Sequence, residues 1–112
     1  AARALDDTRT AMTYARRAVL VQLRGRRRVK QELTAIGLDT ADIRHALTSV
    51  FDEVDEGTIL VRALNKRLQG RLQTRAQFRR LYQALLRQGF EPDQVAQTLV
   101  ARAGGTTAFM EE

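Results

Sequence analysis

A cluster of arginines stands out in the stretch RGRRRVKQELTAIGLDTADIRHAL, residues 24–47. Arg24 is followed by three consecutive arginines at positions 26–28, and Lys30 comes two residues later. A guanidinium group is planar and permanently charged, and it can bind phosphate or carboxylate through two parallel hydrogen bonds. The chemistry available to this cluster is therefore the capture of an anion, such as a nucleic-acid backbone or an acidic protein surface.

Positive charge is distributed along the chain in two blocks. The formal net charge is +6, and the basic residues are almost all arginine. Residues 9–30 hold eight Arg or Lys and no acid, residues 62–87 hold eight more and no acid, and the acidic stretch DEVDE occupies residues 52–56. A solvated helix face usually mixes both signs in i, i+4 pairs. The unmixed blocks favour a binding surface for a polyanionic or acidic partner.

Residues suited to catalysis or metal binding are scarce. His45 is the only histidine, there is no cysteine, and no metalloprotease, hydrolase or phosphate-loop motif occurs. Asp6 and Asp7 are interpreted as favourable charges at a helix start. The acidic stretch 52–56 lacks the glycine and alternating ligands of a calcium loop, and it is interpreted as a charged helix start. We therefore expect no enzyme, catalytic residue, metal site or cofactor.

The composition predicts a small helical protein. The chain has 112 residues, 44% of them apolar, with one Pro and seven Gly, and it is rich in good helix formers. The longest apolar run, residues 18–21, is far too short to cross a membrane, and no signal peptide is evident. The absence of cysteine agrees with a reducing compartment, so we expect a cytoplasmic location without membrane association.

An internal repeat appears at an offset of 52 residues. The segment LTAIGLDTADIRHAL (33–47) aligns with LLRQGFEPDQVAQTL (85–99), which places Gly37 on Gly89 and Leu38 on Phe90. Each copy reads as an amphipathic helix, a glycine, a large apolar residue and a second helix. Both glycines are predicted to adopt positive φ just past a helix end, with the following apolar residue folded back onto the last turn.

Another helical segment precedes each glycine-centred pair, at about residues 6–23 and 55–69. The predicted fold is therefore all-α, with tandem three-helix repeats, two units and about six helices, and helix-turn-helix-like pairs around Gly37 and Gly89. We place the first repeat at residues 1–51, the second at 52–103 and a flexible tail at 104–112.

The helix before each glycine is predicted to carry arginine on its outer side. In the helix at about residues 26–36, Val29, Leu33 and Ile36 are spaced to face the core. The equivalent helix of the second repeat has its apolar stripe at residues 78–85. Two aromatic residues of that stripe are expected to be core, so base stacking is weakly supported. The residues opposite these stripes include Arg27, Arg80 and Arg87.

A helix-turn-helix protein is an alternative, because the second helix of such a pair would enter the DNA major groove. Here the helices at 40–51 and 92–103 carry only Arg44 and Arg102 as basic residues, whereas the other arginines lie before the turn. Sequence-specific reading by these helices is disfavoured. A helical adaptor that does not bind nucleic acid is a further alternative.

Three segments resemble one known family in the same order along the chain. They are LDDTRTAMTYARR (5–17), RVKQELTAIGLDTADIRHAL (28–47) and FRRLYQALLRQGFEPDQVAQTL (78–99), which contains LRQGF at residues 86–90. Together they resemble the bacterial RecX regulatory proteins. The resemblance implies tandem three-helix repeats that bind in the groove of the RecA filament, contact protein and DNA, and oppose its activities without catalysis. It also implies that this chain carries the second and third of three repeats, with residues 1–5 left from the first.

The charge pattern and the resemblance together predict the partners and the binding residues. We expect a monomer that binds RecA filaments and the single-stranded DNA within them, with weak affinity for duplex DNA, and that inhibits recombinase and coprotease activity. The residues predicted to contact RecA or nucleic acid are Arg24, Arg26, Arg27, Arg28, Lys30, Arg75, Arg79, Arg80 and Arg87.

Overall fold

The protein is built entirely of helices in the part of the chain that the structure describes. A computed structural model describes the backbone of residues 2–104 and the side chains of residues 7–104. No strand occurs in this range, which confirms the all-α prediction. The six helices are α1 (Ala2–Leu20), α2 (Arg26–Ile36), α3 (Thr40–Glu53), α4 (Glu56–Arg67), α5 (Arg75–Gln88) and α6 (Pro92–Arg102).

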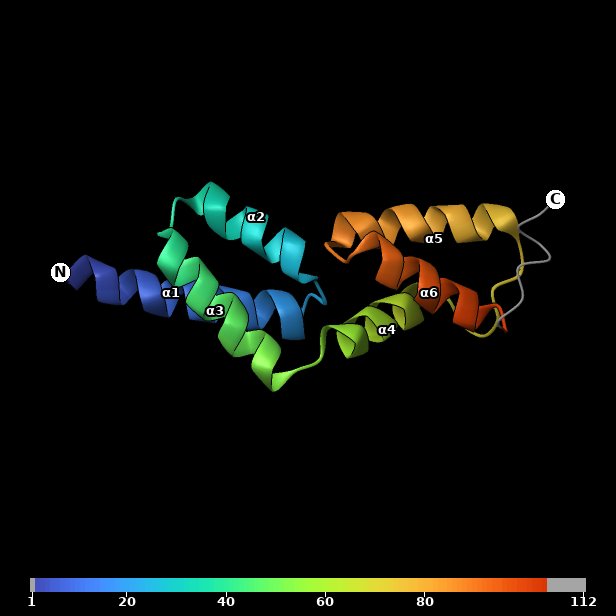
Figure 1. Cartoon of the computed structure of the whole chain (residues 1–112), viewed down its shortest axis with the longest axis horizontal. Helices are drawn as coiled ribbons and strands as arrows, with labels where there is room; N and C mark the ends of the chain where they lie inside the picture. The colour runs from blue at the N-terminus through green and yellow to red at the C-terminus, as the bar shows by residue number, and fades with distance from the viewer. Residues whose placement is uncertain (1, 105–112) are drawn as a thin grey trace.

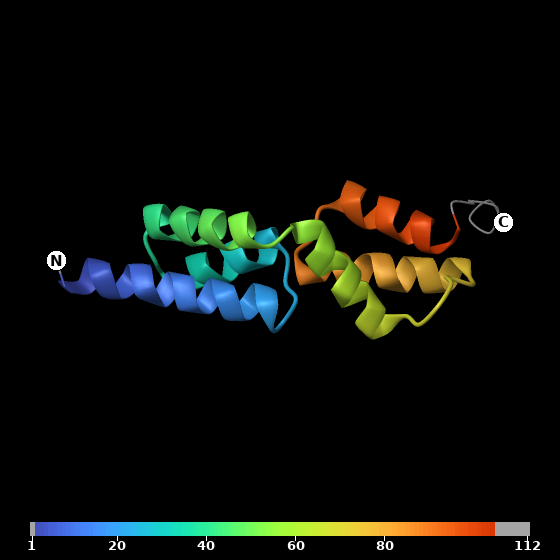
Figure 2. The same ribbon diagram turned by 90° about the horizontal axis from the view of Figure 1, so that it is seen from below.

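The helices form two groups that lie end to end. Helices α1, α2 and α3 pack on one another, and α4, α5 and α6 do the same (Figures 1 and 2). The molecule measures 59 × 22 × 18 Å, and its radius of gyration of 16.3 Å exceeds the roughly 13 Å expected for a compact chain of this length. The division at residues 51 and 52 stays a prediction; α3 itself continues to Glu53. The predicted tail, from residue 105 onward, lies outside the described residues.

Both glycine turns adopt the predicted conformation. Gly37 has φ 94° and Gly89 has φ 109°, each directly after a helix. The N–H of Leu38 donates to the carbonyl of Leu33 at 3.4 Å, and the N–H of Phe90 donates to the carbonyl of Leu85 at 3.3 Å. These bonds satisfy carbonyls that a helix end would leave unpaired. The helix pairs α2–α3 and α5–α6 are therefore closed by the same turn.

Three local predictions were wrong. Asp6 and Asp7 were expected at a helix start, but α1 begins at Ala2 and has no acidic residue in its first turn. Ile36 was expected in the core but is 51% exposed, because α2 ends at this residue and Leu38 beyond the turn packs against the core instead. The acidic stretch 52–56 was expected to start a helix, but its first two residues finish α3. Only its second half begins α4, where the Asp55 carboxylate accepts a hydrogen bond from the Thr58 N–H at 3.1 Å.

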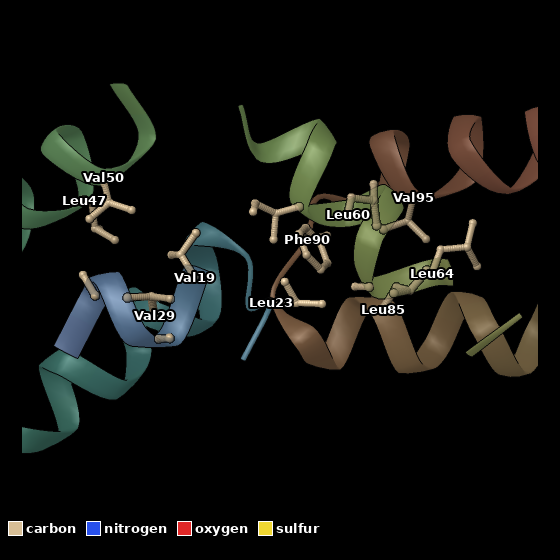
Figure 3. Packing of buried hydrophobic residues seen from close by; sticks show 14 of the residues in the cluster. Val19, Leu23, Val29, Leu47, Val50, Leu60, Leu64, Leu85, Phe90 and Val95 are labelled. Atoms are coloured by element: carbon tan, nitrogen blue, oxygen red, sulfur yellow. The ribbon is translucent and has the colours of Figure 1, made fainter. Parts of the chain in front are cut away.

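The buried apolar side chains form one cluster that runs through both groups of helices. Figure 3 shows Leu23 and Phe90 in the middle of this cluster, between the side chains of the first group and those of the second. Phe90 is fully buried, and Leu23 is 3% exposed. Leu23 has φ 56°, a backbone conformation that is unfavourable for a residue with a Cβ atom. The burial of its side chain at the junction offsets that strain.

The N-terminus of α2 is capped by the other group of helices. Gly25 has no side chain that could cap α2. Its N–H donates to the carbonyl of Gln88 at 2.9 Å, the N–H of Arg27 donates to the carbonyl of Gly89 at 3.2 Å, and the N–H of Arg26 donates to Glu56 Oε2 at 2.8 Å. The C-terminal end of α5 thus meets the N-terminal end of α2 (Figure 1), and the opposite partial charges of the two helix ends attract each other.

This approach requires glycine on both sides. A Cβ atom at Gly25 would lie 2.4 Å from the carbonyl oxygen of Gly89, and a Cβ atom at Gly89 would lie 2.5 Å from Cβ of Arg28. Both distances are far below van der Waals contact. The side-chain amide of Gln88 completes the junction by donating to the carbonyls of Gln22 and Leu23, each at 3.2 Å.

Substitution of Gly25 by alanine tests the junction. Gly25 has φ −81°, so alanine brings no backbone strain there, and the expected loss of about 2–3 kcal/mol in unfolding free energy comes from the steric clash alone. Urea denaturation measures this loss. Small-angle X-ray scattering is expected to show a change in the relative orientation of the two helix groups.

Gly37→Ala is the matched control. A Cβ atom at Gly37 would meet nothing within 4 Å, so only the positive φ disfavours alanine, at about 1–2 kcal/mol. Its scattering profile should equal that of the wild type. A Gly25→Ala protein with wild-type stability and shape would contradict the proposed role of the junction.

Candidate functional site

One carboxylate holds two of the predicted arginines. Glu32 Oε2 accepts from Arg24 Nη1 at 2.7 Å and from Arg28 Nε at 3.0 Å, while Glu32 Oε1 accepts from the Tyr14 hydroxyl at 2.9 Å. Arg28 also donates from Nη1 to the carbonyl of Arg87 at 3.3 Å, at the C-terminal end of α5. Arg24 and Arg28 therefore carry structural contacts that the sequence pattern did not reveal.

The Glu32 network changes the ionisation of two of its members. Partial burial by itself raises the pKa of Glu32, but the hydrogen bonds from Tyr14, Arg28 and Arg24 together outweigh it and lower the pKa below its usual value. Burial and the hydrogen bond to Glu32 raise the pKa of Tyr14. Glu32 is thus held as a carboxylate, and it neutralises part of the charge in the arginine cluster.

An open groove of about 600 Å³ runs along α5. Arg79, Arg80 and Arg87 from α5 line it, as predicted residues of the second repeat. Arg67, at the end of α4, lines the same groove but was not among the predicted residues. Its place in the last turn of a helix within the second basic block was the signal that could have identified it. Glutamine and apolar residues complete the lining: Gln77, Leu81, Gln83 and Ala84.

A second groove, of about 550 Å³, crosses the junction between the two helix groups. Arg27 and Arg28 of α2 line it together with Arg87 of α5, so Arg87 belongs to both grooves. The Arg27 guanidinium lies 3.8 Å from Glu91, but both side chains are more than half exposed, and such a pair contributes little. We call the exposed arginines of these two adjoining grooves the arginine track: Arg27, Arg67, Arg79, Arg80 and Arg87.

The remaining predicted residues lie elsewhere. Arg26 and Lys30 line a third groove, between α2 and α3, with a volume of about 250 Å³. Arg75 lines a hollow of about 220 Å³ with Arg79 and two aromatic rings of α5. Those rings belong to Phe78 and Tyr82, which are half-buried and stacked with centroids 6.3 Å apart. The assignment of all nine residues as contacts to RecA or nucleic acid stays a prediction.

The helices that a helix-turn-helix protein would use carry little free positive charge. Arg44 lies exposed on α3, in the α2–α3 groove. Arg102 at the end of α6 donates from Nη2 to Asn65 Oδ1 of α4. Neither helix offers the row of exposed basic residues that reading of a major groove needs.

The described residues offer neither a cluster of metal ligands nor a helix suited to the membrane interior. Among residues 7–104, no group of three or more His, Cys, Asp or Glu side chains is placed to hold a metal ion. None of the six helices combines the length and the apolar character that a membrane span requires.

Comparison with known proteins identifies one family. The family model for the second three-helix domain of RecX matches residues 6–47, which cover α2 and most of α1 together with the first half of α3. No significant match was found among curated proteins or among solved structures.

Replacement of Glu32 by glutamine tests the network. The neutral amide keeps the shape but weakens three hydrogen bonds to a charged acceptor, so unfolding free energy at neutral pH should fall by about 1–3 kcal/mol. Folding lowers the pKa of Glu32, so its ionisation stabilises the folded wild type at pH values above the unfolded-state pKa of ~4.3. This stabilisation is lost as the pH falls through the lower pKa of the folded state.

The Glu32→Gln protein should therefore lose less stability than the wild type between neutral and acid pH, as measured by urea denaturation at several pH values. Glu53→Gln is the control, because Glu53 pairs with Arg16 in an exposed bridge and should change stability by less than about 1 kcal/mol. Parallel acid profiles for wild type and Glu32→Gln would rule out this role of Glu32.

Proposed function

We propose that this chain, whose residues 6–47 match the family model for the second three-helix domain of RecX, is a RecX-type regulator that binds RecA filaments on single-stranded DNA and inhibits their recombinase and coprotease activities. The proposal includes contact with both the RecA protein and the DNA strand within the filament. It requires no catalytic residue, since a regulator of this kind acts by occupying a surface.

The arginine track is the observation that carries the proposal. Its five guanidinium groups come from α2, α4 and α5, and the junction aligns α5 with α2 along the long axis of the molecule. Arginine side chains can pair with phosphates without reading base sequence. A track of this kind suits an extended polyanion, and its contacts do not depend on the base sequence of that polyanion.

The geometry of the junction supports a single rigid track. Arg27 belongs to the first helix group and Arg80 to the second, and the two groups are joined by backbone hydrogen bonds between Gly25, Arg27, Gln88 and Gly89. Binding does not have to order the two groups relative to each other, and this saving in conformational entropy favours affinity. The 59 Å length of the molecule suits contact with an elongated partner.

The salt dependence of binding to single-stranded DNA provides one measure of the track. If all five arginines neutralise phosphates, the logarithm of the binding constant should fall with the logarithm of salt concentration with a slope of about −3.5.

The functional test measures ATP hydrolysis by RecA on single-stranded DNA with increasing amounts of this chain. The wild type should inhibit hydrolysis. Reversal of one arginine in each helix group, Arg27→Glu with Arg80→Glu, should raise the concentration for half-inhibition at least about tenfold, because each lost charge-assisted contact weakens binding. Circular dichroism should show unchanged helical content.

Arg62→Glu is the matched control, since Arg62 is an exposed arginine of α4 that lines none of the grooves described above. Equal inhibition by the double variant and the wild type would refute the role of the track. Failure of the wild-type chain to affect RecA at any concentration would refute the proposed function itself.

A further inference from the structure

The groove between α2 and α3 combines a cationic rim with an apolar floor. Arg26 and Lys30 of α2 and Arg44 of α3 supply the charges, and the buried side chains of Ile43 and Leu47 lie beneath them. Thr34 and Thr40 complete the lining. No acidic residue lines this groove.

The charges of the rim remain available to a partner. Within residues 7–104, none of Arg26, Lys30 and Arg44 forms an ion pair with a carboxylate. Glu56 binds the backbone N–H of Arg26 and leaves its guanidinium unpaired. That guanidinium lies 4.9 Å from the centroid of the Phe51 ring, which orients it by a cation–π interaction. The rim is therefore charged and partly preorganised before any partner binds.

The floor favours a protein segment over a nucleic-acid backbone. The phosphates of a nucleic-acid backbone are charged, and bringing them onto Ile43 and Leu47 would desolvate that charge without compensation. A protein segment can insert an aliphatic or aromatic side chain into a space of about 250 Å³ and present carboxylates to the rim. The arginine track, by contrast, is open and lined by arginine and glutamine.

We propose that the α2–α3 groove binds an acidic segment of the RecA protein that inserts one apolar side chain between Lys30 and Arg44. This inference rests on the proposed function, and it assigns to the groove the protein component of the filament. Arg44, which was considered only as a base-reading residue of a helix-turn-helix protein, becomes part of a protein-binding site. The groove and the arginine track then serve different components of the same filament.

The two lysines of the chain allow a direct test. Lys30 lies in the groove, and Lys66 lies exposed on α4 outside it; no other lysine occurs in the sequence. A carbodiimide joins a lysine amine to a carboxylate in direct contact without adding a spacer. The full chain is mixed with RecA filaments on single-stranded DNA, co-sedimented, treated with carbodiimide and digested, and the linked peptides are identified by mass spectrometry.

Lys30 is expected to be linked to a RecA carboxylate at least about tenfold more often than Lys66. Lys30→Arg, which keeps the charge, should remove the link and still co-sediment, whereas Lys66→Arg should leave the link unchanged. Arg44→Glu should reduce both the Lys30 link and filament affinity by about tenfold, while Arg62→Glu should reduce neither.

Co-sedimentation without a Lys30 link, or equal links at Lys30 and Lys66, would overturn the groove assignment and leave the proposed function standing. Replacement of the link by ultraviolet cross-links from this groove to DNA would show that nucleic acid occupies it, and would also overturn the assignment. A wild-type chain that does not co-sediment with RecA filaments would overturn both proposals.

Discussion

The backbone contact between Gly25 and Gly89 determines how the rest of the molecule is arranged. It places free N–H groups of one helix end against free carbonyls of another, and the side chains of Glu56 and Arg28 satisfy further groups at these two ends. The buried side chains of Leu23 and Phe90 fill the space beside this contact, and they join the two apolar regions into one cluster. Two small three-helix groups, each with a modest core, are thereby stabilised as one elongated body.

The structure separates arginines that support the fold from arginines that remain available. Arg24 and Arg28 converge on Glu32, and Arg28 also caps a carbonyl at the end of α5. Their neighbour Arg27 points into the junction groove beside Arg87. Arg27 and Arg28 are adjacent in α2 yet differ in role, because consecutive residues of a helix direct their side chains to different surroundings.

Alignment of the helix groups also explains how two separate basic blocks can act as one surface. Residues 9–30 and 62–87 are far apart in sequence, yet Arg27 and Arg87 line the same groove. The opposite side of α2 carries Arg26 and Lys30 above an apolar floor. One helix thus contributes to two surfaces of different chemistry, which is consistent with a partner made of both protein and nucleic acid.

The sequence by itself determined the all-α fold, the paired glycine turns and the position of most helices, because these depend on local periodicity and on the conformations that glycine permits. It also identified the arginine-rich helices, since charge can be counted. It did not reveal the pairing of Arg24 and Arg28 with Glu32, the exposure of Ile36, or the contribution of Arg67. Those features depend on which surfaces meet. Gly25, the residue before α2, has no side chain to cap the helix, and the N–H groups there are satisfied by Gln88, Gly89 and Glu56 of the other helix group. Only the tertiary structure decided this, since a hydrogen bond between segments more than sixty residues apart leaves no periodic signal in the chain.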